Sequence, residues 1–428
     1  MRKLIVLFFV LVPTIVLNAK VIIKGQSLDG QLKYSNTVYE IQSNINLHGK
    51  SVKIPSGCTL IFNGGSINNG TLDLNKCRIE GIGIKCRIKN PENYAYHLSR
   101  FLSDVNDVDL NTVVVQALMD AKVPVIIDYP QITFNNSLSV KSNVTVQSAS
   151  EMKVSLIFPN SRGFVWDEKT SSAYNTFKGL NVTAKSHCFD FVNSGAANRP
   201  MNVYYSTFSN LRVKSEEGDC FTAGQGNYGS TGDSCAFDNL FELIEVIAPK
   251  GSGFYGISGN THHFTKVRCL GCGIAFLYNC SGVFDSCNGT WGTTPTFYKA
   301  TRRGKDAAER YTCIFRNCNV ESYTSVLFDC NDALAYMDLS LENCSFYITP
   351  NEKKVIDYFP FDFVVLYSLR MHNNLIYMYN NGKYDSKHAL IRVVDLSNLS
   401  HLDLDRDVEI MDRNLKKRSL TKLSSELK

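Results

Sequence analysis

The chain has 428 residues, of which 44% are hydrophobic and 20% charged, and its formal net charge at pH 7 is +5. Loss of Arg2 and Lys3 with an N-terminal signal would leave a net charge of +3. Positive and negative residues are then nearly equal in number, so the charge does not require nucleic acid or an acidic surface as partner. No stretch after the first 19 residues approaches the ~20 apolar residues of a membrane-spanning helix.

Residues 1–19 have the pattern of a cleaved secretory signal. Two cations, Arg2 and Lys3, precede an apolar run from Leu4 to Leu17, and the small residue Ala19 follows. No cysteine comes directly after the run, which argues against a lipoprotein anchor. The sequence therefore predicts an exported protein, located in the periplasm, at the cell surface or outside the cell.

Residues 20–100 are expected to form β-rich coils, because short apolar strands alternate with Gly, Asn and Ser turns, as in Ile54–Ile67 and Gly70–Leu74. Residues 101–122 are expected to form a capping helix. Asp109 or Asn111 is the candidate N-cap, since short side-chain oxygens there accept from the first helical N–H groups.

Residues 123–350 are expected to form the parallel β-helix, because a short motif returns between residues 208 and 346: a large apolar residue, a spacer, Asn or Cys, and then an apolar strand. It occurs five times, starting at Phe208, Phe237, Phe284, Phe315 and Leu341, and weaker copies start at Phe177 and Phe264. A second apolar peak often follows 12 or 13 residues later, and it predicts a buried column of Phe189, Phe221, Phe276, Phe297 and Phe328. The strands lack a 3.6-residue period, so the repeat predicts an all-β solenoid of parallel coils.

In a parallel stack, equal positions of successive coils lie about 4.8 Å apart. Inward Asn side chains at the turns are expected to bond the backbone of neighbouring coils. Cys287, Cys318 and Cys344 share one slot, as do Cys188 and Cys220, so buried thiols are expected. Disulfides between adjacent coils and a zinc half-site at Cys269 and Cys272 remain alternatives.

Residues 351–411 are again apolar and strand-like and are expected to form terminal coils or a β-rich cap, because an open last coil exposes unpaired edges. Residues 412–428 form a basic tail that contains Arg413, Lys416, Lys417 and Arg418. A tail of this kind is expected to be solvated.

The segment 104–158 resembles the right-handed parallel β-helix proteins of the pectate-lyase-like superfamily. Its acidic lead Asp104–Asp109, the apolar helix Leu110–Ala121, the strand Val123–Pro130 and the step Ser142-Asn143-Val144-Thr145 follow that family's order. The family's Gly-Gly before the strand is replaced by Lys122-Val123. The resemblance implies a right-handed β-helix with an N-terminal capping helix and an activity on polysaccharides.

An acidic cluster precedes one predicted strand and contains Glu216, Glu217 and Asp219. It faintly resembles the Gly-Asp-Asp-Cys segment of polygalacturonases, although only Asp219 matches. Inverting hydrolysis needs two carboxylates across the bond, and the sequence shows one. Asp219 and Glu217 are candidate acids or Ca²⁺ ligands, and a solvated turn is the alternative.

Two further clusters are candidates for β-elimination on a uronate, which needs a cation at the carboxylate and a base. His262 and His263 point to opposite sides of a strand, so at most one is available. Arg302 and Arg303 are candidate carboxylate ligands, and Lys305 is a candidate base. Tyr255 and Tyr298 are expected to face outward and to stack on sugar rings. Each candidate has a structural alternative. The histidine can be structural, the basic loop can simply be solvated, and the tyrosines can belong to ordinary surface packing.

The sequence therefore predicts an exported β-helix protein that binds an acidic polysaccharide and cleaves it by β-elimination. Two rivals remain: a non-catalytic envelope or adhesin-like glycan-binding module, and a hydrolase of the polygalacturonase type. Fold alone does not choose among them. The sequence leaves the sugar and the oligomeric state open.

Overall fold

The computed structural model describes two compact units, Met1–Glu92 and Asn93–Lys428. Description begins at residue 20 and ends at residue 418. The ranges left out between them are 29, 93–95, 103, 151–153, 167–171, 192–201, 224–234, 258–261, 279–280, 291–295, 301–309, 324–327, 331–335, 349–360, 366–367, 381–382, 386–389, 396–400, 404–408 and 412–416. The predicted signal, residues 1–19, lies outside the described residues.

The first unit is a short stack of parallel strands. One sheet has the order β1 (Lys20–Ile23), β2 (Val38–Ile41), β5 (Thr59–Phe62) and β7 (Arg78–Glu80). The other joins β3 (Asn44–Asn46) and β4 (Ser51–Lys53) to β6 (Ser66–Asp73), which also pairs with β8 (Ile84–Lys89). Alternate side chains are buried because successive residues of a strand point to opposite faces. In β8, for example, Ile84, Cys86 and Ile88 are buried, and the residues between them are exposed.

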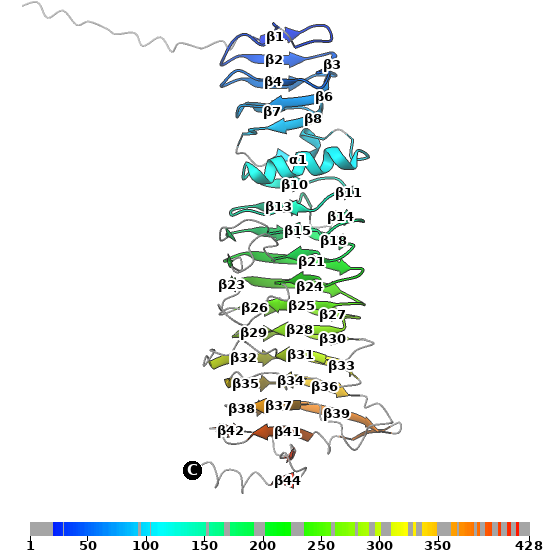
Figure 1. Cartoon of the computed structure of the whole chain (residues 1–428), viewed down its shortest axis with the longest axis vertical. Helices are drawn as coiled ribbons and strands as arrows, with labels where there is room; N and C mark the ends of the chain where they lie inside the picture. Colours follow the sequence, from blue (N-terminus) through cyan, green and yellow to red (C-terminus); the bar gives the residue numbers. More distant parts are fainter. Residues whose placement is uncertain are drawn as a thin grey trace, which may run out of the picture. The chain divides into compact units, whose positions relative to one another are not determined.

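The second unit is a parallel β-helix whose coils contain three strands each, here called the first, second and third rows (Figure 1). The first row comprises β9 (Tyr96–His97), β10 (Val125–Ile127), β13 (Thr145–Ser148), β17 (Thr176–Lys178), β21 (Thr207–Ser215), β24 (Leu240–Ile247), β26 (His262–Thr265), β29 (Gly282–Asp285), β32 (Arg310–Arg316), β35 (Tyr336–Glu342), β38 (Ser368–His372) and β42 (His401–Asp403). The long strands β21 and β24 turn the corner and continue in the second row.

The second row otherwise comprises β11 (Gln131–Thr133), β14 (Val154–Phe158), β18 (Leu180–Ala184), β27 (Arg268–Leu270), β30 (Asn288–Thr290), β33 (Asn319–Tyr323), β36 (Ser345–Ile348) and β39 (Leu375–Asn380), with β40 (Lys383–Asp385) antiparallel to β39. The third row comprises β12 (Leu138–Ser139), β15 (Phe164–Val165), β19 (Phe189–Asp190), β22 (Phe221–Thr222), β25 (Ser252–Ile257), β28 (Ile274–Tyr278), β31 (Thr296–Ala300), β34 (Phe328–Cys330), β37 (Phe361–Val365), β41 (Leu390–Asp395) and β43 (Glu409–Met411), with β44 (Lys417–Arg418) antiparallel to β43. A short extra sheet joins β16 (Ser172–Ala173), β20 (Asn202–Tyr204) and β23 (Cys235–Phe237).

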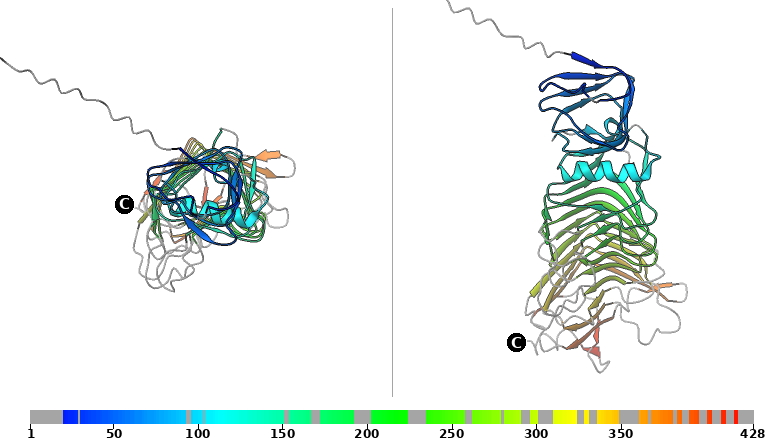
Figure 2. Two further views of the ribbon diagram at one scale, coloured as in Figure 1. Left: turned by 90° about the horizontal axis from the view of Figure 1, so that it is seen from above. Right: turned by 45° about the horizontal axis from the view of Figure 1, so that its top comes forward.

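The helix α1 (Val108–Asp120) covers the N-terminal end of the coils of the second unit, as the right-hand view of Figure 2 shows. A 3-10 turn, Leu98–Arg100, precedes it. The N-cap is Asp107, whose Oδ1 accepts from the amide of Leu110 at 2.9 Å. The expected caps Asp109 and Asn111 were wrong: Asn111 is buried within the helix and donates to the carbonyls of Val105 and Thr133.

The core of the second unit contains two interlocking columns of phenylalanine rings. In the first row, each of five neighbouring pairs from Phe177 to Phe315 stacks with ring centroids 4.3–5.5 Å apart. In the third row, the neighbouring pairs from Phe164 to Phe276 stack with ring centroids 4.7–5.3 Å apart. Rings of the two columns meet edge to face, as Phe264 does with Phe276 at 5.4 Å. Such buried aromatic contacts dominate core energetics.

The predicted column was confirmed in the burial of its members, but its alignment between coils was wrong at two positions. All five predicted phenylalanines are buried, but Tyr298 pairs with Phe276 and with Phe328, so Phe297 lies one position away. The third row also contains Phe254, which the predicted column omitted. In the first row, the partner of Phe208 is Phe241 rather than Phe237, which belongs to β23.

The corner between the first and second rows places one residue in the left-handed backbone region in eight successive coils. These residues have φ between 51° and 71° and are Gly179, Asn210, Leu243, Lys266, Ser286, Asn317, Asn343 and Asn373. The repeated Asn therefore sits at a corner that needs positive φ, which Asn adopts more readily than most residues. Inward Asn side chains that bond adjacent coils occur at other positions, such as Asn239, whose amide oxygen accepts from Ser206 at 2.8 Å.

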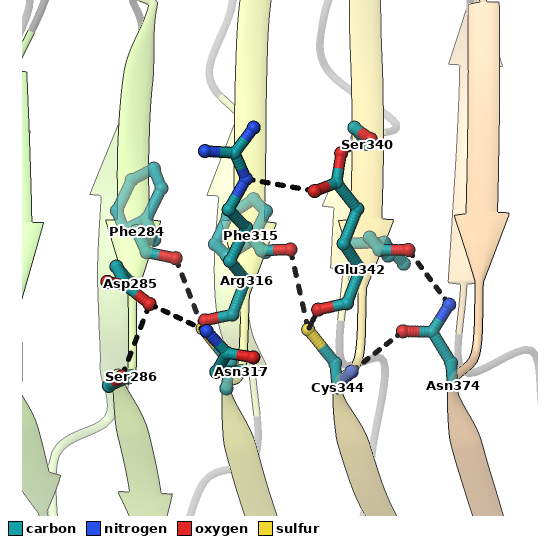
Figure 3. A network of polar contacts seen from close by, with 12 residues as sticks. Phe284, Asp285, Ser286, Phe315, Arg316, Asn317, Ser340, Glu342, Cys344 and Asn374 are labelled. Carbon is teal, nitrogen blue, oxygen red and sulfur yellow. Dashed lines mark hydrogen bonds and ion pairs between the residues drawn. The ribbon is translucent and has the colours of Figure 1, made fainter.

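The thiols of Cys287, Cys318 and Cys344 are buried and free, as predicted. Each donates to the carbonyl of the phenylalanine one coil earlier, at 3.4–3.5 Å, and Figure 3 shows this pattern around Phe315 and Cys344. Burial raises the pKa of the Cys318 thiol well above its usual value. Every cysteine whose side chain the structure describes is free, and three others, Cys235, Cys280 and Cys330, lie outside that set. No helix in the described part of the chain is long and apolar enough to cross a membrane.

Candidate functional site: a carboxylate cluster beside the third row

The third row presents one outward column, because side chains alternate between the core and the outside. In-register pairing places Val165, Asp190, Thr222, Tyr255, Leu277, Lys299 and Asp329 in this column. Asp190 and Thr222 are each only 2% exposed although they alternate with core phenylalanines. Farther along, Lys299 pairs with Asp329 at 3.3 Å. Polar or charged residues therefore occupy most positions of this column.

Asp190 is the most buried acid of this column. Its side chain is 3% exposed, and its Oδ2 lies 2.7 Å from Nη1 of Arg162, on the preceding coil. Arg162 remains 37% exposed. A buried carboxylate needs a partner of this kind, because desolvation otherwise favours its neutral form. The ion pair with Arg162 therefore offsets the burial of this carboxylate.

Asp219 lies one coil later, in the turn that enters β22. Its Oδ1 accepts from the amide of Ser252 at 2.7 Å, and its Oδ2 lies 3.5 Å from Nδ1 of His187. The backbone amide nitrogen of Asp219 lies 3.1 Å from the same Nδ1. We call Arg162, His187, Asp190 and Asp219 the carboxylate cluster.

The pKa of Asp219 is raised above its usual value. Burial is the main cause, and the negative charge of Asp190 adds to it, while the Ser252 amide and His187 oppose it. Asp219 therefore holds a proton more readily than an exposed aspartate does, and Asp190 is paired with an arginine. Two carboxylates in contrasting environments are the usual basis for dividing acid and base roles.

Two glycines allow the turns to pack closely around Asp219. A Cβ at residue 251 would lie 2.3 Å from the carbonyl oxygen of Gly218 and 2.9 Å from Oδ1 of Asp219. A Cβ at residue 218 would lie 2.9 Å from the ring of His187. Larger residues would displace the cluster, so both glycines have a local packing reason.

Of the predicted acids, the structure brings only Asp219 into this cluster. Glu217 is exposed and lies 3.0 Å from Lys185. The Lys185 hydrogen bond and charge lower the pKa of Glu217. Within the described residues, no three His, Cys, Asp or Glu side chains form a metal-binding group. Calcium binding by Asp219 and Glu217 stays a prediction.

The predicted histidines are separated by their strand. His262 is buried, with its ring 6.1 Å from that of Phe241, so it is not the available member of the pair. His263 is exposed on the first row. Asp219 lies in a different part of the coil, in the turn that enters the third row.

Tyr255 lies in the outward column and is partly exposed, as expected. Tyr298 was expected to face outward and instead is 1% exposed, with its hydroxyl 3.4 Å from Sγ of Cys313. The physical reason is the one-residue shift of β31, which turns Tyr298 into the core column. Arg302, Arg303 and Lys305 lie outside the described residues.

Sequence reasoning missed Arg162, His187 and Asp190. They precede Asp219 by 57, 32 and 29 residues, and only the coil register brings them together. The sequence does contain one indication of Asp190: it directly follows the core residue Phe189, as Thr222 follows Phe221.

Comparison with known proteins leaves the family open. No protein-family model matches the chain, and no curated protein matches it. Among solved structures, the catalytic domain of a GH87 α-1,3-glucanase, in complex with tetrasaccharides, matches with 12% identity and a TM-score of 0.28, over 89% of this chain and 69% of that one. Similarity at this level assigns no activity. The parallel β-helix is therefore established by the strand pairing of this chain, and membership of the pectate-lyase-like superfamily stays a prediction.

Proposed function

We propose that the protein is a carbohydrate-active β-helix that binds a polysaccharide along the outward column of the third row and hydrolyses it at the carboxylate cluster. The observation that carries the proposal is a pair of buried carboxyl groups on adjacent coils: Asp190, which is ion-paired with Arg162, and Asp219, whose pKa is raised mainly by burial. Glycoside hydrolysis uses two carboxyl groups, one of which must hold a proton. Asp219 would donate to the leaving oxygen, and Asp190 would act as base or nucleophile.

Hydrolysis matches the described residues better than β-elimination does. Elimination on a uronate needs a cation free to hold the substrate carboxylate. The two described cations at the outward column, Arg162 and Lys299, each already contact a carboxylate. Elimination by Arg302, Arg303 and Lys305 stays a prediction.

A non-catalytic glycan-binding module is the second candidate. It is favoured by the low exposure of the two carboxylates, 3% for the Asp190 side chain and 14% for that of Asp219. Acids this recessed also suit a purely structural role in the coil stack. The two candidates differ in whether any bond is broken.

The test is a product screen with purified protein on polygalacturonate, alginate, hyaluronan, dextran and laminarin. Hydrolysis yields new reducing ends without unsaturated sugars, whereas elimination yields both. The proposal predicts reducing ends alone on at least one polymer. Unsaturated products would overturn it in favour of elimination, and binding without new ends would support the non-catalytic module.

A further inference from the structure

The positive charge of the chain is concentrated in the first unit. Residues 20–92 contain ten Lys and Arg against five Asp and Glu, a net charge of +5. Residues 93–428 contain 33 against 35, a net charge of −2. A local excess of one sign raises the concentration of oppositely charged ligands nearby.

Three of these cations form a row on one strand. Strand β8 buries Ile84, Cys86 and Ile88 and exposes Lys85, Arg87 and Lys89. Residues two apart on a strand lie roughly 6.6 Å from each other on the same face. Lys53, which is also exposed, lies on the same face two strands away, with Asp73 between it and Lys89. We call Lys53, Lys85, Arg87 and Lys89 the basic face.

The basic face is not neutralised by the protein. Among the described residues, none of its four cations is ion-paired, in contrast to Lys20 and Arg78, which contact Glu40 and Glu80. Its neighbours in register are Asn68, Thr71 and Asp73. Asp73 is the one acid among them, and its Oδ1 already accepts from the amide of Asn75 and the side chain of Asn90, each at 3.0 Å.

A row of like charges costs free energy unless a ligand offsets it. The cations follow one another along a strand and do not converge on one point, so the face suits an extended polymer more than a small anion. Beside the cations, Thr71 and Asn68 supply a hydroxyl and an amide that can bond to sugar hydroxyl groups. No large apolar residue lies in this set of neighbours, which disfavours insertion into a lipid surface.

We propose that the basic face of the first unit binds an anionic polysaccharide, with Lys85, Arg87 and Lys89 contacting successive carboxylates or sulfates along the chain. The site is separate from the carboxylate cluster, because all of its residues belong to the first unit. It would hold the protein on an acidic polymer whether or not the second unit cleaves that polymer.

The test measures binding of the full-length protein to polygalacturonate, to dextran sulfate and to uncharged dextran at low and high salt. The variant Lys85→Gln/Arg87→Gln/Lys89→Gln alters only exposed side chains. The matched control Lys24→Gln/Lys33→Gln/Lys178→Gln removes the same charge from exposed positions off the face. We expect the first variant to weaken binding to one or both anionic polymers at least about tenfold and the control to have a much smaller effect.

Equal losses in both triple variants would overturn the proposal, because they would show a dependence on net charge alone. Equal binding to uncharged dextran would also overturn it, as would tighter binding to duplex DNA or to phosphatidylserine vesicles. If the triple variant does not fold, Arg87→Ala tests the centre of the row by the same assays. Because Asp219→Asn leaves the basic face intact, that variant should bind the anionic polymer normally, which separates this proposal from the hydrolase proposal.

Discussion

The left-handed corner residues show how a single backbone position shapes each coil. The amides of several of these residues bond to the next coil; that of Asn343 donates to the carbonyl of His372 at 2.9 Å, and that of Asn317 to the carbonyl of Glu342 at 3.0 Å. This conformation costs most residues about 1–2 kcal/mol, and it costs Asn less. Asn occupies four of the eight corner positions, which makes the motif visible in the sequence.

Asn343→Ala is expected to lower the free energy of unfolding by about 1 kcal/mol, because Ala tolerates positive φ poorly. Asn343→Gly should have a smaller effect. Leu243, which is exposed in the same conformation, offers the opposite test: Leu243→Asn should raise stability. Chemical denaturation measures all three, and a corner without backbone strain would leave the Ala and Gly variants equal.

The buried thiols at Cys287, Cys318 and Cys344 should be unreactive in the folded protein. Their S–H groups are bonded to backbone carbonyls, and the pKa of Cys318 and Cys344 is raised. A thiol-specific reagent should therefore modify them only after denaturant is added. Rapid labelling of these three residues in native buffer, read by peptide mass, would contradict the buried column.

Asp219 should reduce stability at neutral pH. Its folded-state pKa is raised, so the charged form is disfavoured in the folded protein, and stability is lost as pH rises from the unfolded pKa through the folded one. Asp219→Asn, which mimics the protonated acid, should match or exceed the wild-type Tm at pH 7. The difference should vanish below about pH 4. Thermal denaturation across this range would reject the raised pKa if the variant became relatively less stable as pH increased.

At the scale of elements, the phenylalanine columns hold adjacent rows together. Phe264 stacks on Phe241 and Phe284 at 4.8 and 4.7 Å and meets Phe254 and Phe276 edge to face. Its ring therefore contacts three coils and two rows. Loss of one ring leaves a cavity that the stack cannot easily close.

Phe264→Ala should cost about 3–5 kcal/mol, as expected for a buried aromatic. Arg268→Ala, an exposed change on the same coil, should cost less than about 0.5 kcal/mol. Denaturant unfolding of both variants provides the comparison. Equal midpoints would show that the column does not carry the stability of these coils.

The fold was predictable because core, corner and thiol positions recur along the chain, whereas the register was only partly predictable. The first error came from Phe237-Asp238-Asn239, which has the sequence of the repeat but does not occupy its position in the coil. The core residue of that coil is Phe241, and its corner residue is Leu243. Adjacent aromatics caused the second error, since Phe297 and Tyr298 are both buried and only pairing shows which is in the column.

At the scale of the whole molecule, the two units carry different surfaces. The first has the basic face, and the second has the carboxylate cluster, whose members come from successive coils. The sequence could single out Asp219 because acids surround it locally. Asp190 and Arg162 could not be assigned to it, since their contacts depend on how many residues each coil inserts, and that number varies.

The measurement that tests the central claim most directly is the rate at which reducing ends appear on the polymer that the product screen identifies. Wild-type protein is compared with Asp219→Asn and with Glu216→Gln, an exposed acid of the same turn. We predict that Asp219→Asn lowers the rate about 100-fold or more, as loss of a general acid does, while Glu216→Gln retains it. A wild-type rate in Asp219→Asn, or no cleavage by the wild-type protein on any polymer of the screen, would contradict the account.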